Sequence, residues 1–152
     1  TMHLVAEPVA AMSGIPLIDI ITETASTLQA HRRKRPLLLA TRYTMEHGFY
    51  TDRMRAHGLE VMVPATDDRK NVHDIIFNEL CQGQVRETAR RAYLDIIGRA
   101  KANGADCIIL GCTEIGLLID PDTLPLPGFD STTIHADAAI RFALGDEAAQ
   151  AA

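Results

Sequence analysis

The sequence predicts an α/β fold in which a parallel β-sheet is covered by helices. Two observations predict this class. Short runs of consecutive apolar residues recur along the 152-residue chain, and unbroken runs of this kind are typical of strands buried on both faces. Between them lie longer stretches whose apolar residues repeat every three or four positions, as in amphipathic helices. The resulting βαβαβ order implies right-handed crossovers and a parallel sheet.

Five segments are expected to form strands. Four are short apolar runs, at residues 15–20, 37–40, 61–63 and 107–110. The fifth, from Leu124 to Phe129, contains Pro125 and Pro127. Because proline has no backbone N–H to donate, we expect this strand to be irregular or to lie at an edge of the sheet.

Helices are expected between these strands, and a glycine marks the end of each. The first runs from Met45 to Met54 and ends at Gly58, and the next two cover about 69–82 and 84–103. The clearest apolar stripe is that of the 84–103 helix, with members Val85, Ala89, Ala92, Ile96, Ile97 and Ala100. A last helix is expected from Ser131, its N-cap, to about Leu144, followed by a frayed tail.

Composition and charge exclude several classes of protein. Hydrophobic residues make up 47% and charged residues 23%, as in soluble globular proteins rather than disordered chains. No apolar run approaches the roughly 18–20 residues that span a bilayer. The net charge of −5 disfavours nucleic acid as the main partner. The one basic run, at residues 31–35, lies between two apolar segments, which favours a solvated turn over a phosphate-binding patch.

The first residues carry neither the basic start nor the apolar core of a signal peptide. They also lack an initiator Met, so we expect the natural chain to be longer.

The three cysteines are not arranged as a disulfide framework or a zinc site, because their number is odd and no CxxC spacing occurs. This usage indicates a reducing, cytoplasmic compartment. Cys107, within a strand, is expected to be a buried structural thiol. His3, His47 and His135 fall in expected helices without metal-ligand spacing, and we expect structural roles for them. No glycine-rich phosphate loop is present, which argues against nucleotide chemistry.

Small polar residues follow three of the expected strands. Thr41 and Thr44 follow the second strand, Cys112 and Thr113 follow the fourth, and Asp130 follows the fifth. Ligands of open α/β sheets bind at the carboxyl ends of strands, where hydroxyls and helix amides suit a small carboxylate. A helix dipole at this point would lower the pKa of the Cys112 thiol. A small buried side chain at Cys112, and simple helix caps at the threonines, are the alternatives.

Three segments together resemble the aspartate/glutamate racemase family. They are Gly111-Cys112-Thr113-Glu114-Ile115, Thr41-Arg42-Tyr43-Thr44-Met45 and Thr1-Met2-His3, whose order and spacing match over essentially the whole chain. The resemblance implies a cofactor-independent, homodimeric amino-acid racemase with two similar α/β lobes and an active site between them. Residues 1–30 and about 125–152 would belong to a first lobe that is incomplete here, and about 31–124 to the second lobe.

The resemblance also implies roles for individual residues. Cys112 would be the acid/base of the second lobe, and its partner in the first lobe would lie upstream of Thr1. Contacts to the substrate would come from Thr1, Thr41, Thr44, Cys81, Thr113 and Glu114. Cys81 stands where aspartate-directed relatives have a lysine, which leaves room for a broader substrate range unless Arg42 compensates.

Residue chemistry agrees with this reaction, because removing a weakly acidic α-proton without a cofactor needs a poised thiolate and a site that stabilises an enediolate. Two other functions stay open. One is a single-cysteine decarboxylase or isomerase of a small dicarboxylic acid. The other is a non-catalytic domain that binds small acids, in which Cys112 would be dispensable for binding.

Overall fold

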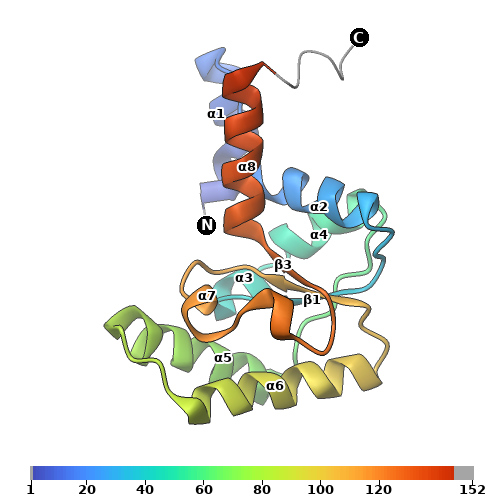
Figure 1. Ribbon diagram of the computed structural model, residues 1–152. Helices are drawn as coiled ribbons and strands as arrows, with labels where there is room; N and C mark the ends of the chain where they lie inside the picture. Colours follow the sequence, from blue (N-terminus) through green and yellow to red (C-terminus); the bar gives the residue numbers. More distant parts are fainter. Residues whose placement is uncertain (1, 146–152) are drawn as a thin grey trace.

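A three-stranded parallel sheet forms the centre of the protein, and helices cover both of its faces (Figure 1). The computed structural model describes residues 2–145. Strands β1 (Pro36–Leu39), β2 (Cys107–Leu110) and β3 (Gly128–Asp130) lie in this order, so β2 is central. Their ends are aligned, since Leu39 pairs with Leu110 and Leu110 with Asp130. The expected α/β class with a parallel sheet is confirmed.

The helices form a layer on each side of the sheet. Helices α5 (Thr66–Asn78) and α6 (Glu87–Ala102) lie below it in Figure 1, and α2 (Ile20–Ala30) and α4 (Phe49–Ala56) lie above. The short helices α3 (Arg42–Glu46) and α7 (Ile115–Leu118) follow β1 and β2. Within residues 2–145, 3₁₀ turns form at Met2–Val5, Leu80–Gln82 and Pro121–Thr123. Among residues 2–145 no helix is both long and apolar enough to cross a membrane.

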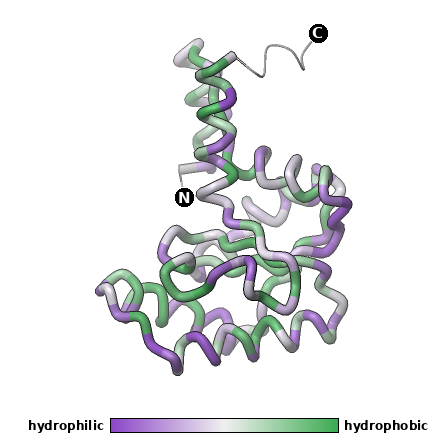
Figure 2. The backbone as a smooth tube through the Cα atoms, viewed as in Figure 1, coloured by the Kyte–Doolittle hydropathy of each residue, from purple (hydrophilic) through white to green (hydrophobic). Residues whose placement is uncertain are grey.

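Helices α1 (Ala6–Ser13) and α8 (Ser131–Leu144) extend away from the sheet (Figure 1). Helix α8 packs its first turns against α2. The projecting part carries hydrophobic segments along both helices, as Figure 2 shows. Several of their apolar side chains are exposed, among them Met12 at 88% and Leu144 at 73%. This part of the protein therefore presents apolar surface to solvent, whereas the sheet is enclosed.

The buried core explains why most expected elements form. Every residue of β1 and β2 is buried, as expected for strands covered on both faces. Helix α6 buries a stripe at helical spacing, made of Ala89, Tyr93, Ile96, Ile97 and Ala100. Val85 was expected in this stripe, but it lies before the helix and is half exposed.

The strand expected at 15–20 was wrong. Ile15 and Leu17 are exposed, and the chain enters α2 at Ile20 instead. Asp19 explains the difference, since its carboxylate accepts a hydrogen bond of 2.9 Å from the Thr22 amide and caps the helix. Helix α2 then buries Ile21, Ala25 and Leu28 among others, an apolar stripe that the sequence analysis missed.

The strand expected at 61–63 forms only in part. Met62 makes a single parallel bridge to Leu37, on the side of β1 away from β2. The expected fifth strand, at 124–129, is shortened to β3, because Pro125 and Pro127 precede the paired residues and have no N–H to donate to a strand partner.

Two helix boundaries also differ from the expectations. The helix expected from Met45 to Met54 is broken into α3 and α4 at Gly48, whose φ of +86° lies in the region that favours glycine. The N-cap of α8 is Asp130, whose carboxylate accepts from the Thr132 amide at 3.0 Å. Ser131, the expected cap, is buried and donates to the Leu110 carbonyl at 2.9 Å. The tail expected to fray lies outside the described residues.

Asp19 joins α2 to α4 through a paired, half-buried guanidinium. The Arg53 Nη atoms donate to both carboxylate oxygens at 3.0 and 2.8 Å. Burial raises the pKa of Asp19, but the Thr22 amide and Arg53 outweigh it and hold this pKa below its ordinary value. We expect Asp19→Asn to lower the free energy of unfolding by about 1–2 kcal/mol at pH 7, since Asn keeps the cap but loses the charge.

This difference depends on pH in a defined direction. Asp19 has a pKa of 3.8 in the unfolded chain and a lower pKa in the folded chain, so its carboxylate stabilises the fold at pH values above 3.8. This contribution is lost as the pH falls through the pKa of the folded chain. Urea titrations of both chains between pH 7 and pH 3 are therefore expected to converge. Asp52→Asn removes an exposed pair with Arg55 and is expected to cost less than about 0.5 kcal/mol. Equal losses for the two variants would contradict the prediction.

The turn between α2 and β1 contains a strained arginine. Arg32 has a φ of +56°. The amides of Arg32 and Arg33 donate to the carbonyls of Gln29 and Leu28, which is the pattern of a Schellman motif with arginine where glycine is usual. We expect Arg32→Gly to raise the free energy of unfolding by about 0.5–1 kcal/mol, measured by urea denaturation. A loss of stability would show that Arg32 makes a compensating interaction.

Candidate active site

The ends of β1 and β2 bring Thr41 and Cys112 to the same edge of the sheet. Each lies two residues beyond a register partner, Leu39 and Leu110 respectively. The close approach of the two strand ends requires glycine at position 111. A Cβ atom there would lie only 3.2 Å from the Ala40 Cβ and from the Leu39 carbonyl oxygen, which is too close for a relaxed contact. The Gly111 amide instead donates to that carbonyl at 2.8 Å. The two segments expected to flank a ligand are therefore neighbours.

Cys112, Thr113 and Glu114 form one hydrogen-bonded cluster at this edge. The Cys112 thiol donates to the Glu114 carboxylate, with 2.9 Å between Sγ and Oε2. The Thr113 hydroxyl donates to the same oxygen at 2.8 Å. These two hydrogen bonds hold the pKa of Glu114 below its ordinary value. Glu114 is thus an ionised acceptor directly beside the half-buried thiol.

The expected lowering of the thiol pKa was wrong. Burial, and secondly the hydrogen bond to Glu114, raise the pKa of Cys112 to about 12. The helix that was to supply a dipole, α7, has four residues and begins only at Ile115. A single turn sums few peptide dipoles, so a nearby carboxylate and desolvation dominate. In this state Cys112 holds its proton and Glu114 accepts the hydrogen bond.

Thr41 and Thr44 lie together at the start of α3. Their hydroxyl oxygens are 3.2 Å apart, and neither caps the helix by its side chain. The Arg42 amide donates to the His73 Nδ1 atom on α5 at 3.4 Å. A surface pocket of about 360 Å³ adjoins this point, and its lining residues are Arg42, Tyr43, Glu46, His47 and His73. Of these five, only Arg42 was considered in the sequence analysis as a substrate contact.

The remaining expected site residues are placed as follows. Cys81 is exposed on the 3₁₀ turn Leu80–Gln82, which lies against α7. Thr1 lies outside the described residues. Cys107 is fully buried in β2, as expected. Among residues 2–145 no group of three His, Cys, Asp or Glu side chains could hold a metal ion.

The histidines expected to be structural make ordinary packing contacts. His3 stacks on Phe49 at 6.3 Å between ring centroids, and the Nε2 atom of His135 lies 2.8 Å from the Ile18 carbonyl oxygen. His47 lies between α3 and α4 rather than within one helix.

Tyr93 is a polar neighbour of the thiol that the sequence analysis missed. Its ring is fully buried in α6, and its hydroxyl donates to the Val72 carbonyl at 3.4 Å. Burial raises the pKa of Tyr93, and ionisation of Cys112 would raise it further, so the two groups lie close enough to interact. The sequence does contain a signal for this residue, since Tyr93 lies in register with the apolar stripe of the 84–103 helix. A tyrosine at such a position is expected to be buried, and a buried hydroxyl needs a polar neighbour.

Comparison with known proteins identifies the family to which the chain is similar. The sequence model of the family described as Asp/Glu/Hydantoin racemase matches residues 1–139. A candidate Asp/Glu racemase from Yersinia pestis has a similar structure, with a TM-score of 0.90 and 45% identity over 94% of this chain and 63% of its own. An aspartate racemase homologue from Pyrococcus horikoshii has a TM-score of 0.86 and 32% identity, over 93% of this chain and 62% of its own.

An aspartate racemase from Picrophilus torridus is a third similar structure, with a TM-score of 0.63 and 28% identity over 84% of this chain and 52% of its own. The chain thus spans less than two thirds of the length of each of these proteins. With a match over 139 consecutive residues and a shared fold, the chain belongs to the Asp/Glu/hydantoin racemase family.

Proposed function

We propose that the chain carries one half of the active site of a cofactor-independent amino-acid racemase for aspartate, glutamate or a related amino acid. The observation that supports this most is the Cys112 thiol, hydrogen-bonded to Glu114 and next to Thr41 at the carboxyl edge of the sheet. A thiol that can exchange a proton with a fixed carboxylate is a suitable acid/base for an α-carbon.

Cys112 is the residue that touches the reacting atoms in this proposal. In its resting state the thiol is protonated, because burial and Glu114 raise its pKa to about 12. It is therefore ready to give a proton to one face of a planar intermediate. For the reverse direction it must first lose that proton, and Glu114 is the acceptor already in contact with it.

The threonines hold the substrate carboxylate. Thr113 lies beside Cys112, with a hydroxyl that donates to Glu114, while Thr41 and Thr44 present two hydroxyls 3.2 Å apart on the neighbouring strand end. Hydrogen-bond donors at a carboxylate strengthen as charge moves onto its oxygens, so they stabilise an enediolate more than the ground state. The acid/base on the opposite face would belong to the first lobe, upstream of Thr1.

The division into lobes is part of the proposal. Residues 1–30 and about 125–152 would complete a first lobe, and about 31–124 form the second. The exposed apolar residues of α1 and α8, and an apolar cavity of about 270 Å³ lined by Val5, Val9 and Leu17 among others, support this. Surface of this kind is normally covered in a complete domain. We further propose a cytoplasmic homodimer.

Proton exchange tests the function. The complete natural chain is incubated in D2O with each enantiomer of aspartate, glutamate and several neutral amino acids, and loss of the α-proton signal is followed by NMR. Exchange accompanied by decay of the optical rotation toward zero would support a racemase, and the responding amino acids give the substrate class. A folded chain that exchanges none of them would overturn the proposal. Release of CO2 from a malonate-type acid would then favour the single-cysteine decarboxylase.

A further inference from the structure

Helix α3 places two of the threonines that hold the substrate carboxylate in the proposed function. Thr41 is the N-cap residue of this helix, and Thr44 lies in its first turn. The helix has five residues, and of these only Met45 is buried. Since an isolated helix of this length is not stable in water, contacts to other elements must hold α3 in place.

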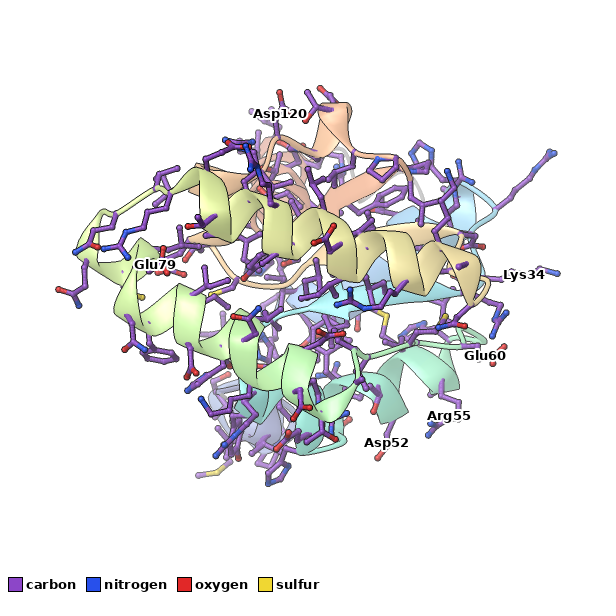
Figure 3. The ribbon with its side chains drawn as sticks, turned by 90° about the horizontal axis from the view of Figure 1, so that it is seen from below. Lys34, Asp52, Arg55, Glu60, Glu79 and Asp120 are labelled. Atoms are coloured by element: carbon purple, nitrogen blue, oxygen red, sulfur yellow. The ribbon has the colours of Figure 1, made fainter. Side chains whose placement is uncertain are left out.

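Helix α5 supplies polar contacts of this kind. It packs against α3, and Figure 3 looks onto α5 and α6, with Glu79 marking the end of α5. The Arg69 Nε atom donates to the Glu46 Oε1 atom at 3.1 Å. Four residues further along α5, the His73 Nδ1 atom accepts from the Arg42 amide at 3.4 Å. Both ends of α3 are therefore held by α5.

Arg69 makes the stronger of these two connections, because its guanidinium meets three acceptors. Besides Glu46, it donates to the Pro64 carbonyl at 3.0 Å and to the Thr66 hydroxyl at 3.2 Å. Pro64 lies two residues after Met62, which makes a parallel bridge to β1. Arg69 thus ties the last residue of α3 to a segment whose position the sheet fixes.

Partial burial makes the pair between Arg69 and Glu46 stronger than an ordinary surface ion pair. The Arg69 side chain is 21% exposed and the Glu46 side chain 40% exposed. A charge-assisted hydrogen bond is both strong and directional when the remaining N–H groups of the guanidinium also have acceptors. A rotation of α3 would separate Glu46 from Arg69, so the pair opposes such a rotation.

We propose that Arg69 is a positioning residue for substrate binding, which acts through Glu46 to hold Thr41 and Thr44 where they receive the carboxylate. This inference rests on the proposed function. Glu46 lies two residues after Thr44 on the same short helix, so a shift of Glu46 also moves the threonines. Arg69 makes its hydrogen bonds to groups of the protein and has no contact with the substrate in this proposal.

Steady-state kinetics of the complete natural chain and of Arg69→Gln test the proposal. Gln lacks the charge and the forked donors of arginine, so the bound substrate has to restore the position of α3. We expect KM to rise about tenfold, because part of the binding free energy is used for this step. The value of kcat is expected to fall less than about threefold, since Cys112 and Glu114 follow the other strand, β2.

Arg69→Lys is a second variant for the case that Arg69→Gln does not fold. Lysine keeps the charge but cannot reach three acceptors with a planar fork. Its KM is expected to lie between those of the original chain and Arg69→Gln. A KM for Arg69→Lys that equals the original value, together with an unchanged KM for Arg69→Gln, would overturn the proposal.

Arg99→Gln is the matched control. Arg99 of α6 pairs with Asp68 of α5 at 2.7 Å, so this variant removes an ion pair from the neighbouring residue of α5 without touching α3. Its KM is expected to stay within about twofold of the original. An equal rise of KM in Arg99→Gln and Arg69→Gln would reduce the effect to a general loosening of α5 and overturn the positioning role.

Hydrogen exchange of the α3 amides, followed by NMR without substrate, separates this inference from the proposed function. The amides of Met45 and His47 donate to carbonyls four residues before them at 3.1 and 3.0 Å. Both are expected to exchange about threefold faster or more in Arg69→Gln, and at the original rate in Arg99→Gln. If the original chain racemises no amino acid, the proposed function fails, and this exchange alone decides whether Arg69 holds α3. Unchanged exchange in Arg69→Gln would overturn the inference even if KM rose.

Discussion

Replacement of Cys112 by Ala is expected to lower the rate of α-proton exchange by about 10³-fold or more. The Cys112 thiol lies at the carboxyl edge of the sheet and donates to the Glu114 carboxylate, with 2.9 Å between Sγ and Oε2. General acid–base groups contribute roughly 10²–10⁴-fold, and Ala leaves the α-carbon with no group to give or take a proton on this face. Substrate affinity is expected to change little, because Thr41, Thr44 and Thr113 remain.

Exchange in D2O measures this loss, and Cys107→Ala is the control. Cys107 is fully buried in β2, and burial raises the pKa of its thiol. We expect this variant to lose about 1 kcal/mol of stability but to keep its exchange rate within a few-fold. If Cys112→Ala exchanged as fast as the original chain, Cys112 would not be the acid/base and the binding-domain alternative would be favoured.

Glu114→Gln is expected to lower kcat by about 10–100-fold while moving the pH profile to lower pH. The ionised Glu114 accepts a hydrogen bond from the Cys112 thiol, with 2.9 Å between Oε2 and Sγ, and contributes to raising the pKa of Cys112. Without this negative charge the pKa of Cys112 falls, so the limb of the profile that rises as the thiol ionises moves toward acid. The rate nevertheless drops, because Gln cannot take up a proton.

The pKa of Cys112 is measured directly by alkylation with iodoacetamide at several pH values, followed by mass spectrometry of the Cys112 peptide. The alkylation midpoint of Glu114→Gln should lie below that of the original chain. Glu87→Gln, which removes an exposed carboxylate paired with arginines on α6, is the control and should leave the midpoint unchanged. A midpoint that rises in Glu114→Gln would show that Glu114 stabilises the thiolate instead.

The sequence was informative where a local pattern decides the structure. The run at 107–110 forms β2 with the expected bounds, and the segment at 84–103 forms α6 with its buried stripe. The run at 15–20 is equally apolar, but Asp19 caps a helix there and pairs with Arg53 on α4. The cap joins residues three positions apart and is a local signal, whereas the pair with Arg53 joins residues 34 positions apart and leaves no local pattern.

For the candidate site, too, the sequence predicted the features that depend on the fold class and missed those that depend on contacts between elements. The placement of Thr41 and Cys112 followed from the rule that parallel strands end at one edge, which is a property of the fold class. The pKa of Cys112 did not follow, because it depends on the length of α7 and the direction of the Glu114 side chain. Tyr93 was missed because its interaction with Cys112 spans two elements.

The parallel pairing of β1 and β2 also has a consequence for folding. Arg35 and Asp106, which join at the start of these strands, are 71 residues apart in the sequence. Closing so large a loop is slow. During synthesis, β1 can pair with β2 only after the ribosome has made residues 107–110. Cys112 lies two residues beyond the end of β2, so we expect its thiol to be accessible to alkylating reagents until β1 and β2 have paired. The rate at which Cys112 becomes protected from alkylation during refolding should therefore equal the rate at which β1 and β2 pair.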